Sequence, residues 1–220
     1  MTGDRGPAVL IRVARNPADW QAVRSLCCRT GDGGDPIEPA RWPLFAELWV
    51  GPYQRLVPEW TYVAEADGRV VSYLNGCPDT AAFRRARRFR VTLGLLVAIA
   101  CRRYVWNTDA RRTVRLALRL RRGTESRLET RLPAGFTGTH PAHLHMNVEE
   151  EYRRRGIGAA LIERYVRDLG AAGVPGLHLV CGAAPRAFYA RNGFTDLAAL
   201  EISPGRWVYT LGRRLGGLAG

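Results

Sequence analysis

The segment over residues 153–159 combines residue types that together suit an anion. It reads Arg-Arg-Arg-Gly-Ile-Gly-Ala and lies between a predicted strand and a predicted helix. Glycines let the backbone turn tightly, so that successive N–H groups point at one place, and the start of a helix adds partial positive charge. We therefore consider this loop a candidate site for a pyrophosphate, although a lone Gly-x-Gly pair also occurs in turns that bind nothing.

Two other glycine-rich phosphate motifs do not fit this loop. A Walker A loop requires Gly-Lys-Ser/Thr, and the chain has no lysine, because all 33 of its basic residues are arginine. The dinucleotide fingerprint requires a third glycine three positions after Gly158, where this chain has Leu161. The loop must therefore be interpreted together with the elements around it.

Polar side chains alternate along the predicted strand just before the loop. Because successive side chains of a strand point to opposite faces, His143, His145, Asn147 and Glu149 share one face of this strand. Histidine and glutamate can each remove a proton from a reacting group. His145 and Glu149 are therefore both candidates for a general base, directly or through a water, whereas we expect His143 to be buried and hydrogen-bonded.

Histidines near this strand also raise the question of zinc. The chain has four of them, His140, His143, His145 and His178, and all lie near the two central strands. Alternating histidines without a nearby cysteine or a supporting acidic shell are more often structural than metal-binding. We therefore predict no metal.

The elements that position these residues follow from hydrophobic periodicity and turn residues. After the loop, apolar residues at i, i+1, i+4, i+5 and i+8 predict a helix that ends near Gly170. Strand, loop, helix and strand form a right-handed βαβ unit, so the strands over residues 143–148 and 177–182 should be parallel neighbours. Further strands are predicted over residues 9–14, 60–66, 70–76, 197–202 and 207–211, and helical stretches over residues 17–29, 40–56, 91–104 and 114–122 and after Pro185.

The loop and a later segment together resemble the GNAT superfamily of acetyltransferases. Arg153, Gly156 and Gly158 match its R/Q-x-x-G-x-G/A signature, and residues 188–194, Phe-Tyr-Ala-Arg-Asn-Gly-Phe, match its F-Y-x-x-x-G-F element. The order of the predicted elements fits most of the chain. The resemblance implies an α/β fold with a central mixed, mostly antiparallel sheet, a splayed parallel pair formed by strands 4 and 5, and helices on both faces.

A closer resemblance is to bacterial acetyltransferases related to the C-terminal domain of eukaryotic protein O-GlcNAcase. It is carried by residues 141–148, Pro-Ala-His-Leu-His-Met-Asn-Val, with support from Asp79-Thr80, Phe83 and residues 176–179. Two positions depart from the pattern. Asn147 stands where the subgroup usually has an acid, and Gly182 stands where many superfamily members have an asparagine.

The family resemblance implies a co-substrate, acetyl-CoA, and an amine acceptor that attacks the thioester directly. The diphosphate would rest on the loop, the pantetheine arm would pair with the backbone of the strand before it, and Tyr189 would protonate the departing thiolate. The catalytic candidates are thus Tyr189, Glu149 and His145. The residues implied for coenzyme binding are Met146, Asn147, Val148, Arg153, Arg154, Arg155, Gly156, Ile157, Gly158, Ala159 and Tyr189.

The positive charge of the chain is concentrated in one segment. The net charge is +13, and residues 77–140 hold 15 arginines against four acidic residues, which gives +11. We interpret the part of this Arg-rich segment over about residues 77–135 as an insertion between strands 3 and 4 of a single domain over residues 1–220, with a solvated basic face. Binding of nucleic acid through residues 84–122 is the less favoured alternative.

Composition also bears on location. Five cysteines without metal-type spacing favour reduced thiols, residues 1–8 carry no apolar leader, and the longest apolar run is about half the ~20 residues that span a membrane. We therefore expect a cytoplasmic protein that does not span a membrane, as a monomer or homodimer.

A second function remains open at this point. A pseudo-acetyltransferase would keep the fold as a binding module and lose the coenzyme site. Because the chain retains Arg153, Gly156 and Gly158, the enzyme is the favoured interpretation.

Overall fold

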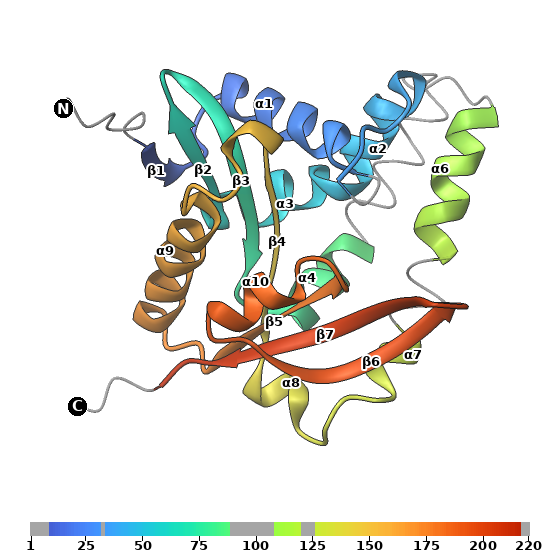
Figure 1. Ribbon diagram of the computed structural model, residues 1–220, viewed down its shortest axis with the longest axis vertical. Coiled ribbons are helices and arrows are strands. Elements are labelled where there is room, and N and C mark those ends of the chain that lie inside the picture. Colours follow the sequence, from blue (N-terminus) through green and yellow to red (C-terminus); the bar gives the residue numbers. More distant parts are fainter. Residues whose placement is uncertain (1–8, 32–33, 89–107, 120–125, 217–220) are drawn as a thin grey trace.

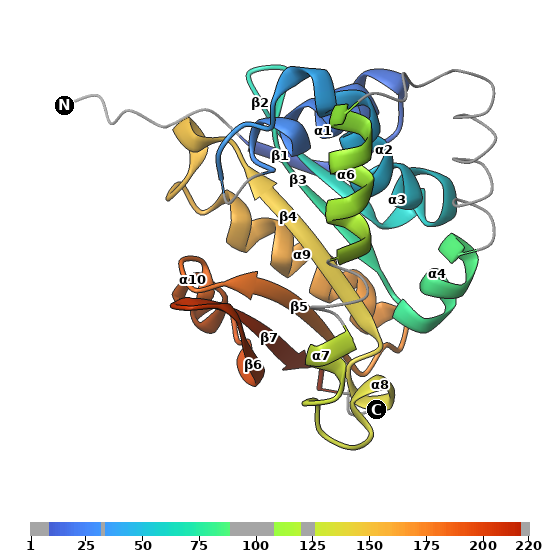
Figure 2. The same cartoon turned by 90° about the vertical axis from the view of Figure 1, so that its right-hand side faces the viewer.

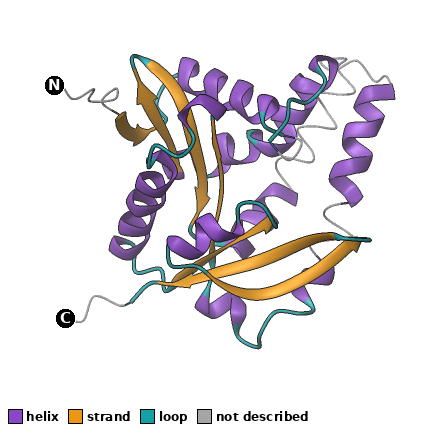
Figure 3. Cartoon of the chain, in the orientation of Figure 1, coloured by secondary structure: helices purple, strands orange, loops and turns teal. Residues whose placement is uncertain are grey.

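The computed structural model describes residues 9–31, 34–88, 108–119 and 126–216 (Figure 1). Its strands form one twisted sheet in the order β1-β2-β3-β4-β5-β7-β6, in which only β4 and β5 are parallel neighbours (Figure 3). The predicted mixed, mostly antiparallel sheet is therefore confirmed. The strands are β1 (Val9–Val13), β2 (Thr61–Ala66), β3 (Arg69–Cys77), β4 (Ala142–Val148), β5 (Gly176–Gly182), β6 (Thr195–Ser203) and β7 (Arg206–Arg214).

The parallel pair at the centre of the sheet is very short. Only Ala142 with Leu177 and His143 with His178 are in register between β4 and β5. β4 continues to pair with β3 as far as Val148, and β5 continues to pair with β7 as far as Gly182. The two strands consequently diverge toward their C-terminal ends, as the view in Figure 2 shows. The expected splay is thus present.

Helices cover both faces of the sheet, as expected. Helix α9 (Ile157–Ala171) packs on one face, where Leu161, Ile162, Tyr165 and Leu169 are fully buried. Helices α1 (Pro17–Arg29), α2 (Trp42–Trp49) and α3 (Gly51–Leu56) lie on the other face (Figure 2). The remaining helices are α4 (Thr80–Ala86), α6 (Thr108–Arg119), α7 (Ser126–Glu129), α8 (Phe136–Thr139) and α10 (Arg186–Arg191), with short 3-10 turns η1 (Pro39–Arg41), η2 (Pro58–Trp60) and η5 (Glu150–Tyr152).

The start of α1 shows how local sequence sets an element. The side chain of Asn16 accepts from the N–H of Asp19, and the Asp19 carboxylate accepts in return from the backbone of Asn16. Pro17 occupies the first turn, where its missing N–H costs nothing. The predicted helix start is therefore confirmed.

The helical stretch expected over residues 40–56 is present, but it is interrupted. The structure divides it into η1, α2 and α3, with the break between α2 and α3 at Val50. Pro52 explains the break, because proline donates no hydrogen bond and its ring clashes with the carbonyl four residues earlier. The hydrophobic period continues across the proline, so the pattern alone did not reveal the break.

Tyr165 connects α9 to the two strands beneath it. Its buried hydroxyl accepts from the N–H of Cys77 at 2.9 Å and lies 2.8 Å from the carbonyl oxygen of His143, to which it donates. The contact fixes α9 against β3 and β4 next to the last paired residue of the parallel pair. The helix that follows the loop is thereby held in place over the diverging strands.

The Arg-rich segment separates β3 from β4. Its described part contains α4, α6, α7 and α8, and Arg41 donates to the buried hydroxyl of Thr113 at 3.0 Å, which ties α6 to η1. The helix expected over residues 91–104 lies outside the described residues, and the stretch over residues 114–122 is described only in part, as the end of α6. Among the described helices, none has the length and apolarity that crossing a membrane requires.

Candidate active site

The loop between β4 and α9 presents a run of backbone donors. In the described part of the chain, no N–H group of residues 154–159 donates to a protein acceptor. Arg154 and Gly156 both have positive φ, at 62° and 79°, and glycine adopts this conformation far more easily than arginine. Six successive donors near the positive end of α9 therefore form a turn that suits an anion, and the binding of a diphosphate there stays a prediction.

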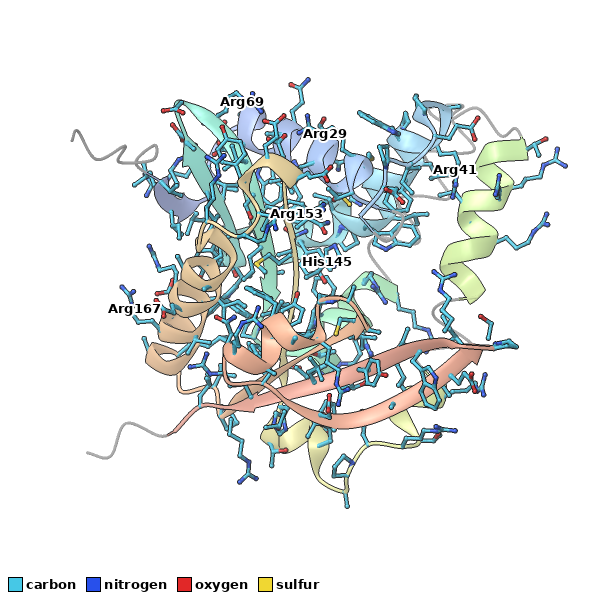
Figure 4. The ribbon with its side chains drawn as sticks, in the orientation of Figure 1. Arg29, Arg41, Arg69, His145, Arg153 and Arg167 are labelled. Atoms are coloured by element: carbon cyan, nitrogen blue, oxygen red, sulfur yellow. The ribbon has the colours of Figure 1, made fainter. Side chains whose placement is uncertain are left out.

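The three arginines of the loop do not all point at this turn. Arg153 folds back, so that its Nε donates to the carbonyl oxygen of Val148 at 3.2 Å (Figure 4). The guanidinium of Arg155 lies over the ring of Tyr152, 5.1 Å from its centroid. Arg153 therefore occupies a backbone acceptor at the end of β4, the strand whose backbone was expected to pair with the pantetheine arm.

Gly158 allows close packing. A Cβ atom added at Gly158 would lie 3.0 Å from Cζ of Phe188 and 3.3 Å from Cε of Met146. Gly158 therefore lets the first turn of α9 approach both β4 and α10. Gly156 has open space around it and is instead constrained by its positive φ.

A cavity of about 330 Å³ lies where β4 and β5 part. Leu144 and His145 line it from β4, and Leu179 and Val180 line it from β5. Its outer wall comes from α2, α3, α4 and α7, through aromatic residues, two arginines and a leucine. These wall residues are Trp49, Tyr53, Phe83, Arg84, Arg87 and Leu128.

His143 has the structural role that was expected. Its Nε2 lies 2.9 Å from the hydroxyl of Tyr53, and its Nδ1 lies 2.8 Å from the hydroxyl of Thr80. Both ring nitrogens are therefore engaged, and burial lowers the pKa of His143 well below its usual value. The residue holds α3 and α4 against β4.

His145 lies nearer the centre of the molecule, on the wall of the cavity (Figure 4). Its Nε2 is 3.4 Å from the amide nitrogen of Asn147, which also donates to the hydroxyl of Tyr73 at 2.8 Å. Burial lowers the pKa of His145 to about 4. The imidazole is therefore neutral at pH 7, and the same burial makes it a weaker base than an exposed histidine.

Glu149 shares the strand face with His145 but is held by two cations. Its Oε1 accepts from Arg29 at 2.5 Å, and its Oε2 accepts from Arg69 at 3.0 Å. The side chain is only 12% exposed. These ion pairs join α1, β3 and the end of β4, and Figure 4 shows Arg153 between Arg29 and His145.

Tyr189 lies on α10 beside the loop helix. Its ring packs against Phe188 and Phe194, and the residue is only 7% exposed. Among the described residues, none forms a hydrogen bond with its hydroxyl. Burial raises its pKa above the usual value of 10, so the phenol keeps its proton throughout the neutral range.

Several cavity residues escaped sequence reasoning. Trp49, Tyr53 and Val208 come from segments far apart in the chain and carry no motif. Only the closer family resemblance drew attention to Thr80 and Phe83 in the sequence. Spatial convergence of this kind is set by the packing of α3 and α4 on the sheet, which periodicity does not encode.

Comparison with known proteins matches both the sequence and the fold of this chain to acetyltransferases. Residues 129–196 match a model described as an acetyltransferase (GNAT) domain. The crystal structure of SsHAT is 31% identical to this chain, covers 96% of it with 100% of its own length, and superposes with a TM-score of 0.72. Two lower-identity structures show the same fold. A putative GNAT-family acetyltransferase from Desulfovibrio desulfuricans is 18% identical, covers 95% of this chain with 100% of its own length, and has a TM-score of 0.58. The ribosomal-protein-S18-alanine N-acetyltransferase from Escherichia coli is 14% identical, covers 97% of this chain with 97% of its own length, and has a TM-score of 0.53.

The buried histidines predict an acid-sensitive fold. Burial lowers the folded-state pKa of His143, and it lowers those of His145 and His178 to about 4, so the unfolded chain binds more protons once the pH falls below about 6.5. Stability is then complete above pH 6.5 and falls between pH 6.5 and 4, by up to about 1.4 kcal/mol per pH unit for each histidine. Urea unfolding at pH 7.5, 6.0 and 5.0 measures this.

The titration of Asp19 does not overlap with that of the histidines in this experiment. Its pKa is lowered to about 2 by the hydrogen bond from Arg12, so it begins to affect stability only below about pH 4. A free energy of unfolding that stays constant or rises from pH 7.5 to pH 5 would contradict the assignment of neutral buried histidines.

Proposed function

Because the chain belongs to the GNAT superfamily of acetyltransferases, we propose that it transfers the acetyl group of acetyl-CoA to a primary amine of a small molecule or protein by direct attack. One observation carries this proposal. A cavity lined by His145 lies where β4 and β5 diverge, and the loop of uncommitted backbone donors follows the C-terminal end of β4. A nucleophile and a thioester can thus approach each other from opposite sides of the sheet.

The proposed reaction exchanges one bond for another. The amine nitrogen attacks the thioester carbon, the N–C bond forms, and the C–S bond breaks. The amine loses a proton to a base, and the coenzyme thiolate gains one from Tyr189. Donors placed where the carbonyl oxygen becomes negative contribute roughly 2.7–4 kcal/mol each in acyl transfer, and we assign this role to a backbone N–H near Val148.

The residues present fit acetyl-CoA. The donors of residues 154–159 suit a diphosphate, and Gly158 brings the loop helix against Phe188 and Met146. The backbone beyond His143 has no ladder partner on β5, which leaves room for an extended arm beside β4. The proposed coenzyme contacts are those expected from the family motif, Met146, Asn147, Val148, Arg153, Arg154, Arg155, Gly156, Ile157, Gly158, Ala159 and Tyr189.

Between the two candidate bases, we favour His145. It lines the cavity and is neutral at pH 7. Both oxygens of Glu149 already accept hydrogen bonds from arginine, so a proton arriving there would displace an ion pair. Glu149 is better placed to hold the end of β4.

The pseudo-acetyltransferase remains the rival of this proposal. The uncommitted donors and the positive φ of Gly156 support coenzyme binding and so favour the enzyme. The closer kinship to O-GlcNAcase-related proteins, the single-domain organisation, a cytoplasmic location and the absence of a nucleic-acid partner stay predictions.

Replacing Gly156 by valine tests the loop. A β-branched residue with positive φ distorts the turn, so we expect acetyl-CoA to bind at least about tenfold more weakly, or ~1.4 kcal/mol. Titration calorimetry measures the affinity. Gly173→Val is the matched control, because Gly173 has a similar φ of 70° and open space at the other end of α9. Equal loss of affinity in both variants would show a general effect on folding and would refute the loop assignment.

Replacing Tyr189 by phenylalanine tests the acid. The variant keeps the ring packed but removes the proton, so we expect kcat to fall by roughly 10²-fold with little change in acetyl-CoA affinity. Stopped-assay turnover and calorimetry measure the two quantities. Tyr209→Phe, which removes a hydroxyl from β7, should leave kcat near the wild-type value. An unchanged kcat in Tyr189→Phe at every pH would remove this residue from the mechanism.

Paired variants distinguish the two bases. His145→Gln should lower kcat/KM by roughly 10²-fold or more and leave acetyl-CoA affinity intact, since only proton removal is lost. Glu149→Gln should mainly lower thermal stability, because Arg29 and Arg69 lose a charged partner. A larger loss of kcat/KM in Glu149→Gln than in His145→Gln, with both variants folded by circular dichroism, would reverse the assignment.

A further inference from the structure

The cavity beside His145 adjoins a second one. The second cavity, of about 380 Å³, is bounded by α4, α7, α8, β5 and β7. Both cavities are lined by Thr80, Arg84, Leu128, His178 and Val180. Because they share these walls, a molecule with its amine near His145 has adjoining space for the rest of its body.

The walls of this two-part space are mainly apolar. Tyr53 and Phe83 line the first cavity, with their rings 4.8 Å apart, and Leu132 and Phe136 line the second. Val180 lies between the two and is 51% exposed, which is unusual for a central strand. An aromatic or aliphatic group would cover this exposed apolar surface.

The charges around this space are mostly positive. Arg84 and Arg87 line it, and both contribute, after burial, to the lowered pKa of His143. Asp79 is the only acidic residue among the described lining, and its Oδ1 accepts from the N–H of Ala82 at the start of α4. Among the described lining residues, positive side chains therefore outnumber acidic ones, which favours an anionic ligand over a polycation.

Thr210 offers a polar contact at the inner end. The residue lines the second cavity and is only 2% exposed, and its Oγ1 has no hydrogen-bond partner among the described residues. A buried hydroxyl without a partner costs free energy. A polar atom of a ligand would supply the missing hydrogen bond.

We propose that the acceptor is a small amine with an apolar, preferably aromatic, body and an anionic group, rather than a polyamine or a lysine-rich peptide. The amine lies beside His145, the body against Phe83 and Val180, and the anionic group within reach of Arg84. This inference rests on the proposed function and specifies its substrate class.

Matched acceptor pairs test the proposal. L-Phenylalanine and 2-phenylethylamine differ only in a carboxylate, 2-aminoethyl phosphate and ethanolamine differ only in a phosphate, and spermidine represents the polycations. With release of the coenzyme thiol as readout, we expect kcat/KM to be at least about tenfold higher for the anionic member of a pair and lowest for spermidine.

Arginine variants identify the contact. Arg84→Gln should lower kcat/KM for phenylalanine at least about tenfold more than for 2-phenylethylamine, because only the former has the anion. Arg167→Gln, on the outer face of α9 (Figure 4), removes the same charge far from the cavity and should not change the ratio. Circular dichroism confirms that each variant is folded.

The outcomes separate this inference from the proposed function. Preference for spermidine or 2-phenylethylamine, or equal losses for both members of a pair in Arg84→Gln, would overturn the acceptor class and leave acetyl transfer standing. Binding of acetyl-CoA without thiol release for any amine would contradict both. Faster release of the coenzyme thiol with the anionic amines, and a selective loss of that advantage in Arg84→Gln, would establish the acceptor class.

Discussion

The site depends on the early end of the parallel pairing between β4 and β5. On their outer sides β4 pairs with β3 from His143 to Val148 and β5 pairs with β7 along its whole length, while the ladder that β4 and β5 share stops after two residue pairs. Unpaired backbone in the middle of a sheet normally costs stability, because each N–H and C=O must find a partner. A ligand that supplies those partners is therefore favoured at this place more than elsewhere on the sheet.

The rest of the fold keeps this opening in place. Tyr165 ties α9 to β3 and β4 where the pairing ends, and His143 ties α3 and α4 to the opposite face of β4. The close contact of Gly158 with Phe188 and Met146 sets the depth of α9 over the gap. Each contact joins a helix to β4 or to its immediate neighbours, so the opening is bounded by packed side chains on both faces.

Sequence patterns predicted the parts that depend on local chemistry. The capping box at Asn16, the glycine loop and the alternation along β4 follow from turn preferences and strand geometry, and all appear in the structure. Errors arose where tertiary packing decided the outcome. Pro52 ended a helix whose apolar pattern continued, and the cavity walls came from residues such as Tyr53 and Val208 that share no motif. The direction of a side chain was equally out of reach, since Arg153 folds over β4 and Glu149 binds two arginines.

Arg153 lies between the end of β4 and the glycine loop. Its Nε donates to the carbonyl oxygen of Val148, at the end of the strand beside which a coenzyme arm would lie. Pairing of that carbonyl with an arm requires the guanidinium to leave, and an exposed arginine can do so because water readily solvates it. The released guanidinium would then be near the loop donors, where a diphosphate needs positive charge. Arg153 thus lies between the end of β4 and the loop donors, while Glu149, held by Arg29 and Arg69, keeps the end of β4 fixed.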